Sequence, residues 1–232
     1  MKYYDYTAAQ LEKRANELLI EFDEERLYKT KPIDIYAVIE KCLDVPYDWK
    51  YLTPDQSILG ATAFSGGLLW VWPESKYYEG LLPYQIEVKP GTILIDSTLT
   101  EQDNRGRENF TVMHEVFHQV LHKKCFRTMP KNYVHPTASR TIDGQIRYAS
   151  YALAMIEKQA NACAAAFLMP SELTSNTYKY IYRNAGIRRI NYGFIYSVIK
   201  EMAEEFSVSQ QAMSIRLQTL GLIDENKENL LK

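Results

Sequence analysis

The chain has 232 residues, of which 46% are hydrophobic, and a formal net charge of -2 at pH 7. This length accommodates one catalytic domain with a small appendage, and the apolar content is sufficient for a hydrophobic core. The near-neutral charge excludes a strong general attraction to nucleic acid or to anionic membranes. No apolar run is long enough to span a bilayer, and the N-terminal residues lack the apolar core of a signal peptide. The three cysteines have no disulfide-framework spacing, so we expect reduced thiols and a cytoplasmic protein.

The first part of the chain predicts two helices and then a small antiparallel sheet. A capping-box pattern at Thr7 opens the first helix, and we expect a second helix from Pro32 to about residue 40. Residues 60–64 and 68–72 flank a Ser-Gly-Gly turn and predict a hairpin. Residues 92–96 predict a further, buried strand.

Residues 110–122 predict a buried helix that carries the motif His114-Glu115-Val116-Phe117-His118. Positions i and i+4 lie on one helical face, so two imidazoles at this spacing can bind one zinc ion. Glu115 stands beside the first imidazole and can take a proton from a metal-bound water as a general base. The chain has only four histidines, and three of them lie in this helix. The motif therefore predicts a zinc-dependent hydrolase.

A catalytic zinc site needs a third protein ligand and one open position. His122 is excluded because it lies roughly 12 Å along the helix axis from His114, at about 1.5 Å per residue. We expect His122 to support the ligands or the helix end instead. The best donor is Glu157, on an Ala-rich helix expected from about residue 145 to residue 168, and Asn161, one turn later, can orient a ligand. The rival donors are Asp143, Cys125, Cys163 and His135.

Two further questions concern the substrate. A zincin places a strand antiparallel to the bound peptide, and either residues 68–72 or residues 92–96 suit that role. His135, Tyr148 and Tyr151 are candidates by residue type for the group that stabilises the oxyanion. The sequence leaves both choices open.

The C-terminal part predicts a helix over residues 194–206, an N-cap at Ser209 and a helix over residues 210–220. This outline is typical of a helix-turn-helix. Only Arg216 and Lys227 are basic between residues 201 and 228, so we expect no direct DNA binding. We divide the chain into a catalytic domain over residues 1–190 and a helical segment over residues 191–232. The apolar residues Val208, Ile215, Leu217 and Leu220 predict that this segment packs on the catalytic domain or docks a substrate.

The sequence resembles the ImmA/IrrE family of bacterial zinc metallopeptidases. The resemblance rests on residues 110–122, on the E-x-x-A-N pattern of residues 157–161 and on Phe167-Leu168-Met169-Pro170. It extends from the first helix to about residue 224. The chain departs from the family pattern at Asn109, where Arg is usual, at Phe117, where Gly is usual, and at Cys163, where Phe is usual.

This resemblance implies an α+β fold: a mainly helical, zincin-like metallopeptidase domain with a small antiparallel sheet. It implies that His114, His118 and Glu157 bind Zn²⁺ and that Glu115 is the catalytic base. It also implies a protein substrate, such as a helix-turn-helix transcriptional repressor of a mobile element or a stress regulon. Two alternatives stay open: a non-proteolytic regulator that binds its partner through the same site, and a zinc hydrolase that acts on a small amide.

Overall fold

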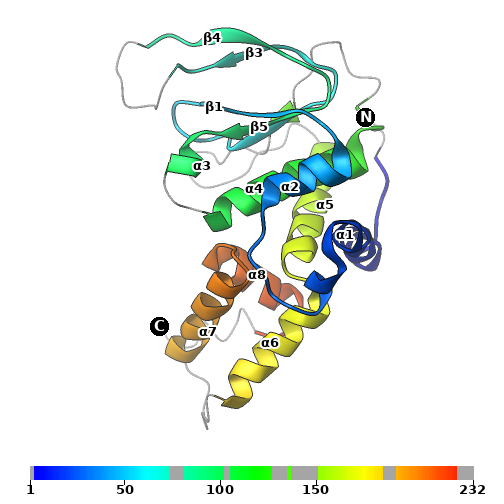
Figure 1. Cartoon of the computed structure of the whole chain (residues 1–232), viewed down its shortest axis with the longest axis vertical. Coiled ribbons are helices and arrows are strands. Elements are labelled where there is room, and N and C mark those ends of the chain that lie inside the picture. Colours follow the sequence, from blue (N-terminus) through cyan, green and yellow to red (C-terminus); the bar gives the residue numbers. More distant parts are fainter. Residues whose placement is uncertain are drawn as a thin grey trace.

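The computed structural model describes residues 3–73, 81–101, 105–126, 135–136, 151–184 and 192–223. Figure 1 shows a β region at one end of the molecule, the helices α4 (Arg105–Phe117) and α5 (Tyr151–Leu168) in the middle, and further helices at the other end. The fold is α+β and mainly helical, as the sequence predicts. Within the described part of the chain, no helix is both long and apolar enough to cross a membrane.

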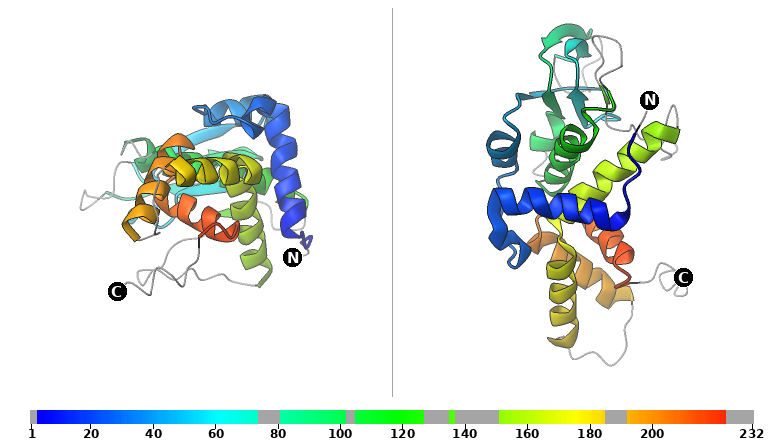
Figure 2. Two further views of the ribbon diagram at one scale, coloured as in Figure 1. Left: turned by 90° about the horizontal axis from the view of Figure 1, so that it is seen from below. Right: turned by 90° about the vertical axis from the view of Figure 1, so that its right-hand side faces the viewer.

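Helix α1 (Ala8–Asp23) begins at the predicted capping box. The Thr7 side chain accepts from the backbone N–H of Gln10, and the Gln10 side chain accepts from the backbone N–H of Thr7. The buried face of the helix consists of Leu11, Ala15, Leu18 and Leu19. In Figure 2, α1 lies across α5, with which it is in contact. The capping pattern and the apolar stripe therefore position this helix as the sequence indicates.

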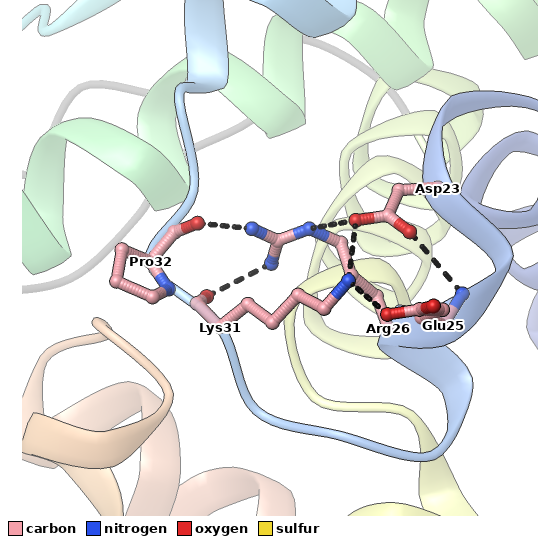
Figure 3. A network of polar contacts seen from close by, with 5 residues as sticks. All are labelled: Asp23, Glu25, Arg26, Lys31 and Pro32. Carbon is pink, nitrogen blue, oxygen red and sulfur yellow. Dashed lines mark hydrogen bonds and ion pairs between the residues drawn. The ribbon is translucent and has the colours of Figure 1, made fainter.

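A polar network holds the connection that follows α1 and the 3₁₀ turn η1 (Glu24–Leu27) (Figure 3). Arg26 donates to the backbone carbonyls of Lys31, at 3.0 Å, and of Pro32. Lys31 is paired in turn with Glu25, at 2.5 Å, and with Asp23, at 3.3 Å. These contacts fix the Lys31–Pro32 segment outside any helix.

The second helix begins later than predicted, at α2 (Ile35–Val38), and continues as the π-helical turn η2 (Ile39–Leu43). The prediction that Pro32 starts this helix is wrong. The Asp34 side chain accepts from the backbone N–H of Ala37 at 3.3 Å, so Asp34 is the N-cap. A short polar side chain that satisfies an N–H of the first turn sets the start of a helix more strongly than an upstream proline.

The main sheet has four strands in the order β1 (Tyr47–Lys50), β5 (Thr92–Asp96), β2 (Gly60–Ala63) and β6 (His135–Pro136). Strand β1 is parallel to β5, whereas β2 is antiparallel to both β5 and β6. The sheet is therefore mixed, and the prediction of an antiparallel sheet is wrong on this point. The predicted strand over residues 92–96 is confirmed, and all five of its residues are buried.

The predicted hairpin between residues 60–64 and 68–72 does not form. Strand β3 (Gly67–Val71) pairs with β4 (Tyr84–Val88) in a separate two-stranded sheet. All four residues of β2 are buried, whereas Leu68 and Trp70 of β3 are exposed. A strand buried on both faces belongs inside a packed layer, so β2 joins the main sheet and leaves β3 to pair elsewhere.

Helix α4 lies between the sheet and helix α5, and it is in contact with β2, with β5 and with α5. The side chains of Ala160 and Ala164 on α5 are fully buried, and their small size permits a close approach of the two helices. The short helix α3 (Thr98–Glu101) precedes α4, and the π-helical turn η3 (His118–His122) continues it. This layering places one face of α4 against β2 and another against α5.

Three helices follow α5 in the described part of the chain: α6 (Ser171–Asn184), α7 (Tyr192–Glu205) and α8 (Gln210–Thr219). The predicted N-cap of α8 is confirmed, since Ser209 accepts from the backbone N–H of Ala212 at 3.1 Å. Helix α6 was not expected from the sequence. The likeness of α7 and α8 to a helix-turn-helix, and the domain boundary at residue 190, stay predictions.

The C-terminal helices share the hydrophobic core of α4 and α5. Met213 and Leu217 of α8 are fully buried in that core, whereas Ile215, predicted on the same apolar face, is 54% exposed. Residues 213 and 217 are one turn apart and face the core together, and residue 215 lies on the opposite side. Arg216 donates to both carboxylate oxygens of Glu12, at 2.8 and 2.9 Å, and to the carbonyl of Met169 at 2.9 Å. Helix α8 is therefore bound to α1 and to the end of α5.

Candidate metal centre

Two imidazoles and one carboxylate converge between α4 and α5. Ligand atoms of His114, His118 and Glu157 all lie within 4.8 Å of one another. The two Nε2 atoms are 2.8 Å apart, and each lies near one oxygen of Glu157, at 3.1 Å for His114 and 3.2 Å for His118. All three residues are at most 2% exposed. The helical spacing that predicts a shared face for the histidines is thus realised, and α5 supplies the carboxylate.

The second nitrogen of each imidazole has a side-chain hydrogen-bond partner. Nδ1 of His114 lies 2.9 Å from Oδ1 of Asn161, and Nδ1 of His118 lies 3.0 Å from Nδ1 of His122. His122 is therefore outside the three-residue cluster, behind His118. The amide oxygen of Asn161 can only accept, so His114 carries its proton on Nδ1 and directs the Nε2 lone pair toward Glu157.

Glu115 is fully buried between α4 and β2. Its Oε2 atom accepts from the Thr62 hydroxyl at 2.5 Å, and within the described residues its Oε1 atom is buried without a hydrogen-bond partner. Burial raises the pKa of Glu115 to about 8, although His114 and the Thr62 hydroxyl act in the opposite direction. A water molecule at Oε1 would satisfy this buried atom.

Strand β2 supplies two residues that the sequence analysis missed. Thr62 orients the Glu115 carboxylate, and Gly60 makes room for it: a Cβ atom at position 60 would lie 2.8 Å from Oε1 of Glu115. The residues Gly-Ala-Thr form no sequence pattern that would indicate a contact with the helix of the H-E-x-x-H motif. The only signal was the small size of its residues, which is compatible with burial but does not indicate a contact.

Among the described residues, neither Cys125 nor Cys163 joins the cluster. Cys163 is fully buried, its thiol donates to the carbonyl of Leu11 at 3.3 Å, and burial raises its pKa to about 12. Cys125 is buried in a separate apolar cluster with Phe126 and Ile156. Asp143 and the side chain of His135 lie outside the described residues. Among the oxyanion candidates, Tyr151 is 74% exposed, and Tyr148 also lies outside the described residues.

A protein-family model described as the IrrE N-terminal-like domain (Peptidase_M78) matches residues 81–218, more than half of the chain. The chain belongs to this peptidase family. The matched residues include α4, α5 and α8, and hence the whole cluster of His114, His118 and Glu157. A search of curated proteins finds no significant match to the chain.

The departures from the ImmA/IrrE pattern have structural explanations. Phe117 is fully buried and packs against Phe167, with ring centroids 6.1 Å apart, so its ring fills the core beside the cluster. Asn109 donates to the carbonyl of Ser207 at 2.9 Å, in the turn between α7 and α8. The turn approaches α4 so closely that a Cβ atom at Gly106 would lie 2.4 Å from the Val208 backbone. These residues join the C-terminal helices to the start of α4.

The strand that contacts Glu115 is β2, through Thr62. It is neither of the two strands, residues 68–72 and residues 92–96, that the sequence suggests for substrate binding. Strand β5, the candidate over residues 92–96, has both edges paired, with β1 and with β2, so it cannot accept a peptide as an additional strand. Strand β3, the other candidate, belongs to the separate two-stranded sheet. The second edge of β2 pairs with the backbone of His135–Pro136.

The cluster is chemically suited to a metal ion. Two imidazole nitrogens with a carboxylate oxygen form the donor set of many catalytic zinc sites. Two Nε2 lone pairs that face each other at 2.8 Å repel unless a proton or a cation lies between them. Burial opposes a proton on His114, but Glu157 and Glu115 outweigh it and raise the pKa of this imidazole. The same two carboxylates would stabilise a bound cation.

Proposed function

We propose that this chain is a zinc-dependent endopeptidase in which His114, His118 and Glu157 hold Zn²⁺ and Glu115 is the general base. The observation that carries the proposal is the convergence of two Nε2 atoms and a carboxylate at His114, His118 and Glu157, with the buried Glu115 next to His114 in the chain. Membership of the peptidase family supports the reaction class. The buried donor set supports the metal.

Zinc, when bound, would polarise the scissile carbonyl and lower the pKa of a coordinated water. Oε1 of Glu115 accepts a proton from the attacking water as the new C–O bond forms. It then donates that proton to the amide nitrogen as the C–N bond breaks. The burial that raises the Glu115 pKa favours the protonated carboxyl that this second transfer requires. Thr62 holds the other carboxylate oxygen, so the same atom accepts and returns the proton.

The substrate we propose is a protein in the bacterial cytoplasm, a helix-turn-helix transcriptional repressor of a mobile element or a stress regulon. The resemblance to ImmA/IrrE peptidases supports this choice. Direct DNA binding is not part of the proposal. Arg216, one of the two basic residues between residues 201 and 228, is 5% exposed and paired with Glu12, so it is not available to a phosphate.

The second candidate function is regulation by binding alone, without proteolysis. The burial of the site favours it, since Glu115 and His118 are both 0% exposed. A partner that only docks over the cluster needs no access to Glu115, whereas a scissile peptide does. The Glu115→Gln protein separates the two functions, because it removes the base and leaves the surface unchanged.

The proposal is tested with a candidate substrate, a helix-turn-helix repressor chosen from the genes that neighbour the gene for this chain. Zinc-loaded protein is incubated with that repressor, with and without a chelator, and the products are identified by mass spectrometry. We expect cleavage at one site, loss of cleavage with the chelator and recovery on addition of zinc. Cleavage that persists in Glu115→Gln, or after full removal of metal, would exclude the proposed mechanism.

A further inference from the structure

A chain of buried hydrogen bonds leads from His118 to the backbone at the start of the protein. Nδ1 of His118 lies 3.0 Å from Nδ1 of His122, and Nε2 of His122 lies 3.1 Å from Oε1 of Gln159. The amide nitrogen of Gln159 donates to the carbonyl of Tyr4 at 2.7 Å. The three side chains are at most 2% exposed. Water therefore does not compete for these positions.

The direction of every bond in this chain follows from its last member. A backbone carbonyl only accepts, so the Gln159 amide must turn its NH₂ group toward Tyr4 and its oxygen toward His122. That oxygen also only accepts, so His122 carries its proton on Nε2. The Nδ1 atom of neutral His122 is then an acceptor, and His118 must carry its own proton on Nδ1. This leaves the Nε2 lone pair of His118 on the side of His114 and Glu157.

We infer that Gln159 is a positioning residue that selects, through His122, the tautomer in which His118 can coordinate zinc. The inference rests on the zinc site of the proposed function. For His114, Asn161 accepts directly from Nδ1. For His118, the acceptor is His122, and the tautomer of His122 is set in turn by Gln159. The opposite tautomer of His118 would direct an N–H group into the cluster and could not bind a cation.

A glutamine suits this position because it both donates and accepts. Leucine at position 159 offers no acceptor to His122, so both tautomers of His122 become accessible. Glutamate keeps an acceptor for the His122 proton but loses the donor to Tyr4. The two substitutions therefore separate the effect on the histidines from the effect on the N-terminal segment.

The first measurement is the tautomer of each histidine in the zinc-loaded, ¹⁵N-histidine-labelled protein, read from ring-nitrogen chemical shifts. The chain has four histidines, so the ring signals can be assigned individually. We expect the proton of His122 on Nε2 and that of His118 on Nδ1. In Gln159→Leu we expect His122 to populate both tautomers, and in Gln159→Glu we expect it to keep the proton on Nε2.

The second measurement is zinc affinity, by competition with a chromophoric chelator. Loss of a partner of this kind weakens metal binding by about 10- to 100-fold, so we expect that decrease in Gln159→Leu and a smaller one in Gln159→Glu. Gln119→Leu is the matched control: Gln119 is also buried and also donates to a backbone carbonyl, that of Gly91, at 3.0 Å. We expect the zinc affinity of this control to stay within about twofold of wild type, since within the described residues the Gln119 side chain is hydrogen-bonded to the Gly91 carbonyl and to no imidazole.

The outcomes distinguish this inference from the proposed function. If the wild-type protein binds zinc but carries the His122 proton on Nδ1, the inference is wrong and the proposed function is unaffected. This result does not depend on whether the variants fold. Unchanged zinc affinity in Gln159→Leu would also overturn it. A wild-type protein that binds no zinc would overturn the proposed function, and the inference with it.

Discussion

The Thr62 hydroxyl donates to Oε2 of Glu115 over 2.5 Å and so joins strand β2 to the helix that carries the H-E-x-x-H motif. Both residues are fully buried. The bond occupies one oxygen of the carboxylate, and the other, Oε1, is buried without a hydrogen-bond partner within the described residues. The bond makes the sheet, and not only the two helices, part of the candidate active site.

Replacement of Thr62 by valine removes this donor and keeps the side-chain volume. We expect kcat for peptide hydrolysis to fall roughly tenfold, since a buried charged acceptor loses about 1.5–3 kcal/mol of hydrogen bonding and the base loses its orientation. Zinc affinity should stay at the wild-type value because the Thr62 hydroxyl, within the described residues, is hydrogen-bonded to Glu115 and not to His114, His118 or Glu157. Thr62→Ser, which keeps the hydroxyl, should recover most of the rate. Equal rates for the valine and serine proteins would rule out the positioning role.

Replacement of Glu115 by glutamine removes the proton acceptor with almost no change of shape. We expect kcat to fall by about 10² or more, the scale of general acid–base catalysis, while one zinc per chain is retained. The measurement pairs single-turnover kinetics with metal analysis of the same sample. If the variant does not cleave the repressor but still relieves repression in cells, the binding-only function is correct.

The metal-free protein should lose stability as the pH rises from about 5 to about 8. The pKa of Glu115 is raised to about 8 from its usual value near 4.5, so over this range the folded state holds a proton that the unfolded state releases. Stability is therefore greatest below pH 5 for this group and falls as the pH approaches 8. Urea unfolding at several pH values measures it. The free energy of unfolding of Glu115→Gln should decline less over this pH range. An equal decline in both proteins would show that another group causes it.

Helix α8 should depend on the ion pair between Arg216 and Glu12. In Arg216→Leu, the Glu12 carboxylate keeps the backbone N–H of Ser171 but loses its cationic partner, and the Met169 carbonyl loses the Arg216 donor, so we expect a loss of about 3 kcal/mol in the free energy of unfolding. The matched control is Arg14→Leu, which breaks the exposed pair with Glu17 and should cost less than about 1 kcal/mol. Equal losses in the two variants, measured by denaturant unfolding, would contradict a structural role for the buried pair.

Helices α1, α4, α5, α7 and α8 could be predicted from the sequence because their signals are local. The capping box at Thr7, the N-cap at Ser209 and the i, i+4 spacing of His114 and His118 each lie within a few residues. Glu157 could be placed opposite the histidines because an Ala-rich helix approaches its neighbour closely. The geometry of the cluster thus follows from two short segments.

Strand pairing could not be predicted in the same way, because it joins residues far apart in the chain. Strand β2 was expected to pair with the segment that follows it, but its partners are β5 and β6. The contacts of Thr62 with Glu115 and of Gln159 with Tyr4 span 53 and 155 residues. No periodicity within either segment indicates such a contact, so Thr62 and Gln159 could be found only from the structure.

The proposed metal site is tested most directly by the zinc stoichiometry and coordination of the purified protein after saturation with zinc. We predict one ion per chain, bound by His114, His118 and Glu157 with bonds of roughly 2.0–2.2 Å in an anomalous-diffraction structure. Glu157→Ala should weaken zinc binding strongly, whereas Cys163→Ala, a buried change on the same helix, should leave it unchanged. Zinc held by Cys125, Cys163 or His122, or no zinc at saturation, would contradict the assignment of His114, His118 and Glu157 as the zinc ligands.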